Sequence, residues 1–279
     1  MDAMKIIEAN GARIPAIGLG TYRLEGETCV EMVGKAIGAG YRHLDTARMY
    51  GNEAEVGQGI RASGIDRDEL FVTTKVWTDD LAPSDFRRSA EAAVRALDVG
   101  AVDLLLIHWP NASIPLEGTI DALNRAREDG LTRHIGVANF DSALLERAAK
   151  LSRHPLVCNQ VEYHPRLSQE KVHEACQRLG MAMIAYSPIG QGKDLLADPA
   201  VTEMAKRYGK TPAQVVLRWE IEQPMVGAIP RTSKPERLAE NLDVFDFELQ
   251  DEDRRRLHEM SRSRQRLVNP SFAPRWDDR

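Results

Sequence analysis

The sequence of 279 residues has few cysteines, few aromatic residues and no long apolar run. Its three cysteines, Cys29, Cys158 and Cys176, include no Cys-x-x-Cys pair, so neither a disulfide framework nor a zinc site is indicated. No stretch of about 18 apolar residues occurs, which predicts that no helix spans a membrane. The first residues also lack the apolar core of a signal peptide. We therefore expect a soluble, cytoplasmic protein.

The sequence also lacks excess positive charge, because its formal net charge is −5. This balance argues against a nucleic-acid partner, since such partners require basic patches that neutralise phosphates. The basic run Arg254–Arg266 is flanked by acidic residues and is interpreted as a solvated helix face. No linker rich in proline, glycine or serine divides the chain. We expect a single domain over residues 1–279, and a monomer.

Short apolar runs alternate with segments of helical periodicity along the whole chain. The runs are apolar throughout rather than alternating, as is typical of parallel strands buried on both faces. Eight such units favour a (β/α)8 TIM barrel over a doubly wound sheet, which usually stops at six or seven strands. The predicted strands are Ala16–Thr21, Arg42–Thr46, Leu70–Val76, Val102–Trp109, His134–Asn139, Val157–Tyr163, Met181–Ser187 and Met225–Pro230.

Three segments fall outside the eight repeated units. An N-terminal β-hairpin with Asn10-Gly11 at its turn is expected to cover the bottom of the barrel. Asp198–Lys210 is predicted to form an extra helix before the seventh barrel helix, and Asp251–Met260 another after the eighth. The Thr211–Gln214 segment carries a capping box that predicts the start of the seventh barrel helix.

Polar side chains stand at the ends of consecutive predicted strands, where barrel enzymes place their chemistry. Asp45 ends the second, with Tyr50 just beyond it, Lys75 ends the third and His108 the fourth. Each alone is more simply a cap, a solvated lysine or a packing residue. Together they converge, and an ammonium beside a tyrosine is expected to lower the phenol pKa. Such a phenol can protonate a developing alkoxide, but a cofactor must supply hydride.

The cofactor site is expected in the loop Ile229–Asn241 after the eighth strand. No Gly-x-Gly-x-x-Gly fingerprint follows any predicted strand, so the usual dinucleotide fold is not indicated. In barrels, however, a phosphate site commonly forms after strands seven and eight. Arg231 and Arg237 lie at the start of a predicted helix and suggest an additional phosphate, as on NADPH. A basic helix turn exposed on the surface explains these residues equally well.

Eight motifs, in order and spacing, resemble the aldo-keto reductase family over nearly the full chain, and its bacterial subgroup similar to 2,5-diketo-D-gluconate reductase in particular. The motifs are GLGTY, YRHLDTARMYGNEAEVG, TTKVW, DLLLIHWP, IGVANF, NQVEYHP, AYSPIG and IPRTSKPERLAENLDVFDFEL. The resemblance implies NADPH-dependent reduction of aldehydes and ketones to alcohols on a TIM barrel, with NADPH extended across its mouth.

The resemblance also implies a role for each matching residue. Asp45, Tyr50, Lys75 and His108 would form the catalytic tetrad, with Tyr50 as general acid and no metal. Tyr22, Trp77 and Trp109 would line the substrate pocket. The implied cofactor-binding residues are Thr21, Asn139, Gln160, Tyr186, Ser187, Arg231, Thr232, Ser233, Arg237, Glu240 and Asn241.

Two positions depart from the family pattern. Ala138 stands where the family commonly has serine, so a hydroxyl bond to the nicotinamide carboxamide is missing, and Ala138→Ser is expected to tighten cofactor binding. Arg231 stands where lysine is frequent, but arginine grips phosphate bidentately, so a preference for NADPH over NADH should survive.

The C-terminal tail and the function class each leave alternatives open. The tail after Leu267 is short, and Phe272 and Trp276 either reach the substrate pocket or belong to a frayed terminus. One alternative function is an NADPH-binding barrel that acts as a sensor or subunit with little turnover. Another is a metal-dependent hydrolase, for which the His43-x-Asp45 pair is the only hint.

Overall fold

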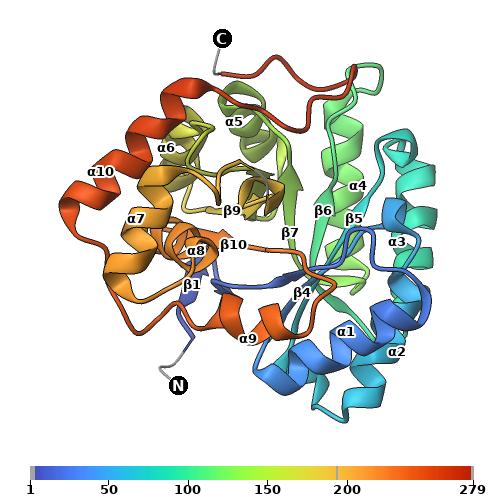
Figure 1. Ribbon diagram of the computed structural model, residues 1–279. Helices are drawn as coiled ribbons and strands as arrows, with labels where there is room; N and C mark the ends of the chain where they lie inside the picture. The colour runs from blue at the N-terminus through green and yellow to red at the C-terminus, as the bar shows by residue number, and fades with distance from the viewer. Residues whose placement is uncertain (1–3, 193, 278–279) are drawn as a thin grey trace.

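Eight parallel strands form a closed barrel in the computed structural model, which describes residues 4–192 and 194–277 (Figure 1). Neighbouring strands pair in chain order from β3 to β10. The barrel closes where Ala228 of β10 accepts from the Gly18 amide at 2.9 Å and donates to the Ala16 carbonyl at 2.7 Å. The predicted TIM barrel is therefore confirmed. The strands are β3 (Leu19–Gly20), β4 (His43–Asp45), β5 (Phe71–Val76), β6 (Val102–Ile107), β7 (Thr132–Ala138), β8 (Leu156–Glu162), β9 (Ala182–Tyr186) and β10 (Val226–Ala228).

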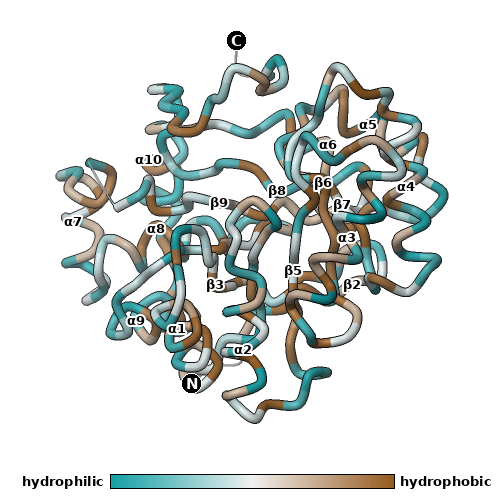
Figure 2. The backbone as a smooth tube through the Cα atoms, turned by 90° about the vertical axis from the view of Figure 1, so that its right-hand side faces the viewer, coloured by the Kyte–Doolittle hydropathy of each residue, from teal (hydrophilic) through white to brown (hydrophobic). Residues whose placement is uncertain are grey.

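The barrel helices surround the strands, and most of them bury one apolar stripe against them. Every residue of β5, β6 and β8 is buried, which explains why the runs are apolar without alternation. The outer tube alternates between hydrophilic and hydrophobic colour along the helices, as one-sided burial requires (Figure 2). These helices are α1 (Gly26–Ala39), α2 (Glu53–Ser63), α3 (Pro83–Leu97), α4 (Leu116–Glu128), α5 (Ser142–Leu151), α6 (Glu170–Arg178), α8 (Pro212–Glu222) and α9 (Glu236–Leu242).

The two extra helices occur where the sequence predicts them. They are α7 (Pro199–Tyr208), between β9 and α8, and α10 (Asp251–Met260), after α9. The buried Asp253 carboxylate of α10 accepts from the Arg207 guanidinium at 2.9 Å and from the Tyr208 hydroxyl at 2.6 Å, both on α7. Among the described residues no helix is long and apolar enough to cross a membrane.

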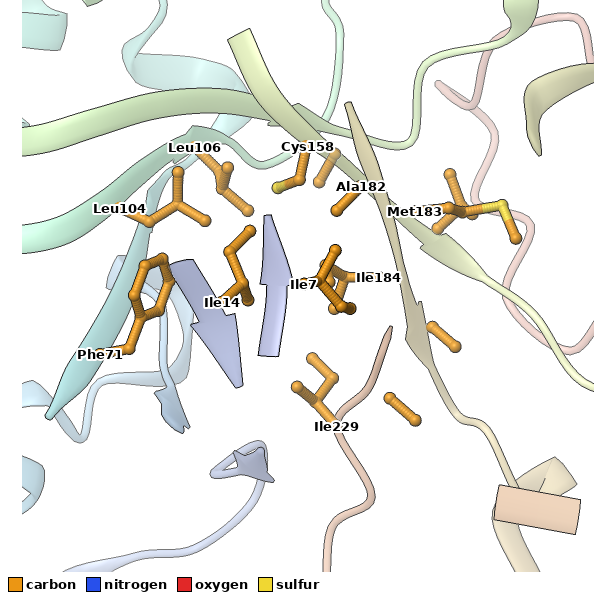
Figure 3. Close-up of a cluster of buried hydrophobic side chains, with 14 of the residues drawn as sticks. Ile7, Ile14, Phe71, Leu104, Leu106, Cys158, Ala182, Met183, Ile184 and Ile229 are labelled. Carbon is orange, nitrogen blue, oxygen red and sulfur yellow. The ribbon is translucent and has the colours of Figure 1, made fainter. Parts of the chain in front are cut away.

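The N-terminal hairpin closes the end of the barrel opposite the site. Strands β1 (Ile6–Ala9) and β2 (Ala12–Pro15) pair antiparallel across Asn10 and Gly11, whose φ angles of 47° and 87° are both left-handed. Two such angles define the turn type that Asn-Gly favours. Ile7 and Ile14 project from the hairpin into the apolar interior of the barrel (Figure 3). The predicted hairpin is confirmed.

Glu220 of α8 has a buried carboxyl group with no hydrogen-bond partner among the described residues. Its side chain is fully buried, and neither carboxylate oxygen has a hydrogen-bond partner within the part of the chain that the structure describes. Burial raises the pKa of Glu220 well above its usual value. The folded protein therefore holds this group neutral at a pH where the unfolded chain ionises it, so folding becomes less favourable as pH rises.

Replacing Glu220 with Gln should therefore stabilise the protein, and more so at neutral than at acidic pH. Below the unfolded-state pKa of about 4.3, both states carry the proton and the substitution has no electrostatic benefit. Above it, the wild type loses about 1.4 kcal/mol of unfolding free energy per pH unit until the folded carboxyl ionises. Urea unfolding at pH 5, 6 and 7 measures this. The exposed Glu174→Gln is the control, and a benefit independent of pH would contradict the account.

Candidate active site

A cavity of about 850 Å³ opens at the C-terminal ends of the strands. Its walls come from the ends of β3, β4 and β6 to β10 and from the loops that follow them. The structure thus brings together most residues predicted from sequence. Those that line the cavity are Thr21, Tyr22, Asp45, Tyr50, His108, Trp109, Asn139, Gln160, Tyr186, Ser187, Arg231, Thr232, Ser233 and Arg237.

Lys75 and Asp45 form a fully buried ion pair at the floor of this cavity. The Lys75 ammonium donates to Asp45 Oδ1 at 2.5 Å and to the Thr46 carbonyl at 2.9 Å, and lies 3.5 Å from the Tyr50 hydroxyl. Asp45 Oδ2 accepts from the Gln160 amide at 2.7 Å. Burial lowers the pKa of Lys75, and Asp45 opposes that shift. Each charged group of the pair therefore has at least two hydrogen-bond partners, and the Tyr50 hydroxyl lies next to the ammonium.

Tyr50 is placed by a short 3-10 helix, Arg48–Tyr50, that begins three residues after the end of β4. Gly51 ends this helix with a left-handed φ of 69°. The Arg48 guanidinium pairs at 2.5 Å with Glu53, whose carboxylate is buried. Asn52 donates two hydrogen bonds of 2.8 Å to carbonyls of the loop between β3 and α1. These contacts fix the turn and hold the phenol over the end of the barrel.

The Tyr50 ring is packed among aromatic groups, and the side chain is half-buried at the wall of the cavity. Its centroid lies 5.0 Å from that of Tyr22 and 5.6 Å from that of His108. Burial raises the pKa of Tyr50 well above its usual value, and the Asp45 carboxylate raises it further. We expected Lys75 to lower this pKa. The pKa is instead raised, because burial and the neighbouring Asp45 carboxylate both disfavour the phenolate.

His108 is neutral in this environment. Burial lowers its pKa well below the usual value, and the nearby Lys75 charge lowers it further. Its ring meets Trp77 edge-on with centroids 5.1 Å apart, and its carbonyl accepts from the Asn139 amide at 2.9 Å. Nδ1 is buried and has no hydrogen-bond partner among residues 4–192 and 194–277. A buried ring nitrogen without a partner costs less free energy as a bare acceptor than as an N–H donor. The tautomer with its proton on Nε2 is therefore favoured.

The wall formed by β7, β8 and β9 carries two residues in strained backbone conformations. Asn139 and Ser187 directly follow β7 and β9, with left-handed φ angles of 63° and 51°. The side-chain oxygen Oδ1 of Asn139 accepts from the Tyr186 hydroxyl at 2.8 Å. Left-handed angles in non-glycine residues cost free energy and concentrate at functional sites. Here they turn side chains at the strand ends towards one cavity.

The charge of the cavity is opposite to that of the whole protein. Its described lining residues include four cations, Arg23, Arg231, Lys234 and Arg237, and a single carboxylate, Asp45, which is already paired. The Arg231 guanidinium donates to the Tyr22 carbonyl at 3.0 Å and to the Arg23 carbonyl at 2.7 Å. These bonds connect the loop after β10 to the loop after β3. Since the protein carries a net charge of −5, this cluster points to a ligand with several negative charges.

Some predicted residues lie outside the cavity lining. Glu240 instead accepts a hydrogen bond of 2.7 Å from the hydroxyl of Thr211, the residue before α8, and Asn241 is buried. Trp77 packs against the ring of His108, which lines the cavity, and Lys75 is buried beneath the cavity. Their proposed roles toward cofactor or substrate remain predictions.

The C-terminal tail contributes residues to the site that sequence reasoning missed. Leu267 and Val268 line the cavity. Phe272 packs edge-on against Trp77 and Trp109, with centroids 5.9 and 5.7 Å apart. Only the weak signal of two aromatic residues in the tail pointed this way. The described part of the tail packs against the barrel, with Trp276 buried and Asp277 bound to Ser142.

The comparisons with known proteins agree with this geometry. A model of the Aldo/keto reductase family matches residues 16–262. The chain belongs to this family. It is 39% identical to the glyoxal reductase of Bacillus subtilis (strain 168), over 94% of each chain. It is likewise 39% identical to the 9,11-endoperoxide prostaglandin H2 reductase of Trypanosoma cruzi (strain CL Brener), over 95% of this chain and 94% of the relative.

The chain is also similar to solved structures. A protein provisionally named 2,5-diketo-D-gluconic acid reductase B shares 45% identity at a TM-score of 0.96, with 99% of this chain and 98% of the other covered. A Bombyx mori aldo-keto reductase in complex with NADP shares 34% identity at a TM-score of 0.88, over 96% of each. The family expected from the motifs is therefore confirmed, and this aldo/keto reductase is an NADPH-dependent oxidoreductase.

Proposed function

We propose that this aldo/keto reductase reduces aldehydes and ketones to alcohols, with Tyr50 as the proton donor. The observation that carries the proposal is the placement of the Tyr50 hydroxyl. It lies in the cavity, 3.5 Å from a buried ammonium and beside a neutral histidine. Because burial raises its pKa, the phenol keeps its proton at neutral pH and can give it to an oxygen that gains charge.

The residues of the cavity fit NADPH. When bound, the cofactor supplies hydride to the carbonyl carbon. Arg231, Lys234 and Arg237 are exposed cations at one side of the cavity and suit its phosphate groups. Asn139 and Gln160 offer amide groups, and Tyr186 an aromatic face, beside the catalytic tetrad. Thr21, Ser187, Thr232 and Ser233 add hydroxyl groups along the same cavity.

The carbonyl oxygen of the substrate would lie between Tyr50 and His108. With its proton on Nε2, the neutral imidazole would donate a hydrogen bond to that oxygen and orient it. Tyr50 would then transfer its proton as the oxygen gains charge, and Lys75 would stabilise the resulting phenolate. Asp45 would hold Lys75 in place through their 2.5 Å contact. Tyr22, Trp77 and Trp109 would bound the substrate pocket on its apolar side.

A panel of aldehydes, ketones and α-dicarbonyls tests this function by loss of NADPH absorbance. We expect turnover of several members with NADPH, and slower turnover with NADH at equal concentration. Tight NADPH binding without turnover of any substrate would favour the alternative, a sensor or subunit that binds the cofactor. A clear preference for NADH would contradict the role given to Arg231 and Arg237.

Ala138→Ser should tighten NADPH binding. Ala138 is buried at the end of β7, directly before Asn139, so a hydroxyl there would lie next to the proposed carboxamide site. One added hydrogen bond is worth roughly 0.5–1.5 kcal/mol, or about two- to tenfold in Kd. Fluorescence titration with NADPH measures it. Unchanged or weaker affinity in the variant would argue against carboxamide binding at Asn139.

The protein is further proposed to act as a cytoplasmic monomer. The large apolar side chains that are exposed among the described residues are Ile6, Tyr22, Met49 and Phe272. Tyr22 and Met49 line the cavity and Phe272 packs on two residues of its rim. This leaves little apolar surface for a partner chain. Light scattering on protein eluted from a size-exclusion column measures its molar mass and so tests whether it is a monomer.

A further inference from the structure

The C-terminal tail, residues 261–277, forms a strap held to the barrel by several contacts, two of which are made by carboxylates. After α10 it crosses one side of the molecule towards the loops that follow β6, and returns past α5 (Figure 1). Leu267 and Val268, near its beginning, line the catalytic cavity. Trp276, near its end, is buried, and its ring centroid lies 6.0 Å from that of Trp109. The position of the strap therefore determines the shape of one cavity wall.

The first fastening is the Glu162 carboxylate at the end of β8. This side chain is fully buried. Its Oε1 accepts from the Leu267 amide and its Oε2 from the Val268 amide, both at 2.7 Å. His164 Nε2 lies 3.1 Å from Oε1. Hydrogen bonds to a buried carboxylate are among the strong ones, because the charge has no water to replace them.

The second fastening is Asp277 at the N-terminus of α5. Its carboxylate accepts from the Ser142 amide at 2.7 Å and from the Ser142 hydroxyl at 2.9 Å. Between the two fastenings, Phe272 packs against Trp77 and Trp109 and is 44% exposed. The outer part of the strap therefore has its own support. Glu162 binds the two wall residues themselves, and just before them the Gln265 amide donates to the Arg166 carbonyl at 2.8 Å.

Glu162 also lies on the same strand as a residue of the catalytic site. It follows Gln160 by two residues on β8 and pairs with Tyr186 across the sheet. Because side chains two apart on a strand share a face, Glu162 and Gln160 extend from the same side of β8. Gln160 binds Asp45, and Glu162 binds the strap. One short segment of strand thus fixes the floor of the cavity and one of its walls together.

We propose that Glu162 is a positioning residue that holds Leu267 and Val268 as an apolar wall of the substrate pocket. This inference rests on the proposed carbonyl reduction. A substrate with an aromatic ring needs that wall for apolar contact, whereas glyoxal is too small to gain much from it. Glu162 therefore sets the preference of the enzyme for bulky aromatic over small carbonyl compounds.

Hydrogen exchange of the cofactor-free protein tests the fastening without any turnover. In Glu162→Gln, one carboxylate oxygen becomes an amide donor that faces a backbone N–H. We expect the Leu267 and Val268 amides to exchange at least about tenfold faster than in the wild type, while the interior of β8 keeps its protection. Glu174→Gln, an exposed neutralisation on α6, should leave both amides protected. Undiminished protection in Glu162→Gln would overturn the proposal.

Kinetics of the same variants test the effect on substrate preference. For benzaldehyde, Glu162→Gln should raise KM about tenfold with kcat near that of the wild type, as expected for a lost binding contact. For glyoxal, KM should change less than about twofold. Equal changes for both substrates would show only a structural role and overturn the proposal. If the wild type reduced neither benzaldehyde nor glyoxal, the proposed function would fail. The hydrogen-exchange result would still show whether Glu162 holds the Leu267 and Val268 amides.

A variant on the strap covers the case in which Glu162→Gln does not fold. Val268→Pro removes one of the two amide donors and leaves the buried carboxylate and β8 intact. We expect faster exchange at Leu267 and a higher KM for benzaldehyde, with the thermal unfolding temperature little changed. Wild-type exchange and KM in this variant would contradict the role assigned to Glu162.

Discussion

Tyr50→Phe should lower kcat for carbonyl reduction about a thousandfold and leave NADPH affinity within about twofold of the wild type. A positioned general acid contributes about 10²–10⁴-fold, and phenylalanine keeps the ring but has no proton to give. The Tyr50 hydroxyl has Lys75 as its hydrogen-bond partner at 3.5 Å, so its loss leaves no strong donor unsatisfied. Steady-state kinetics and fluorescence titration with NADPH provide the two measurements.

Tyr22→Phe is the matched control for this experiment. Tyr22 lines the same cavity, and its ring lies 5.0 Å from that of Tyr50, but it is 44% exposed and is not among the described hydrogen-bond partners of Lys75. Removal of its hydroxyl should lower kcat by at most about tenfold. Near-normal turnover by Tyr50→Phe, or an equal loss in both variants, would refute the assignment of Tyr50 as the acid.

The fold could be predicted because the strands of a parallel barrel are buried on both faces. β5, β6 and β8 are buried at every residue, which leaves continuous apolar runs in the sequence. The hairpin and α7 carry local signals as well, namely Asn10-Gly11 at the turn and Pro199 after the cap Asp198. Such signals depend on neighbours in the chain, and can therefore be read without a structure.

The candidate site could be predicted only in part. Asp45, Lys75 and His108 were found because strand ends in a barrel converge whatever the loops do. The strap was missed because Val268 and Glu162 are 106 residues apart, and no local pattern marks a backbone amide that binds a distant carboxylate. The pKa of Tyr50 was predicted in the wrong direction, because it depends on burial, which residue types alone do not reveal.

Lys75→Met should cost both stability and activity, and a second substitution should separate the two losses. Without the ammonium, the buried Asp45 carboxylate keeps only the Gln160 amide, at 2.7 Å, among its side-chain partners within the described chain. Breaking a buried pair from one side typically costs about 3–5 kcal/mol. Urea unfolding should show this loss. The value of kcat should fall at least about a hundredfold, because Tyr50 loses the charge that stabilises its phenolate.

The double variant Asp45→Asn/Lys75→Met removes the uncompensated charge and should recover much of the stability lost in the single variant. Neutral replacement of a buried pair is often tolerated, since the desolvation cost disappears along with the attraction. Activity should not recover, because no neutral group replaces the ammonium beside Tyr50. Recovery of stability without activity would assign the pair to chemistry. Recovery of both would mean that Lys75 serves only to fold the floor of the barrel.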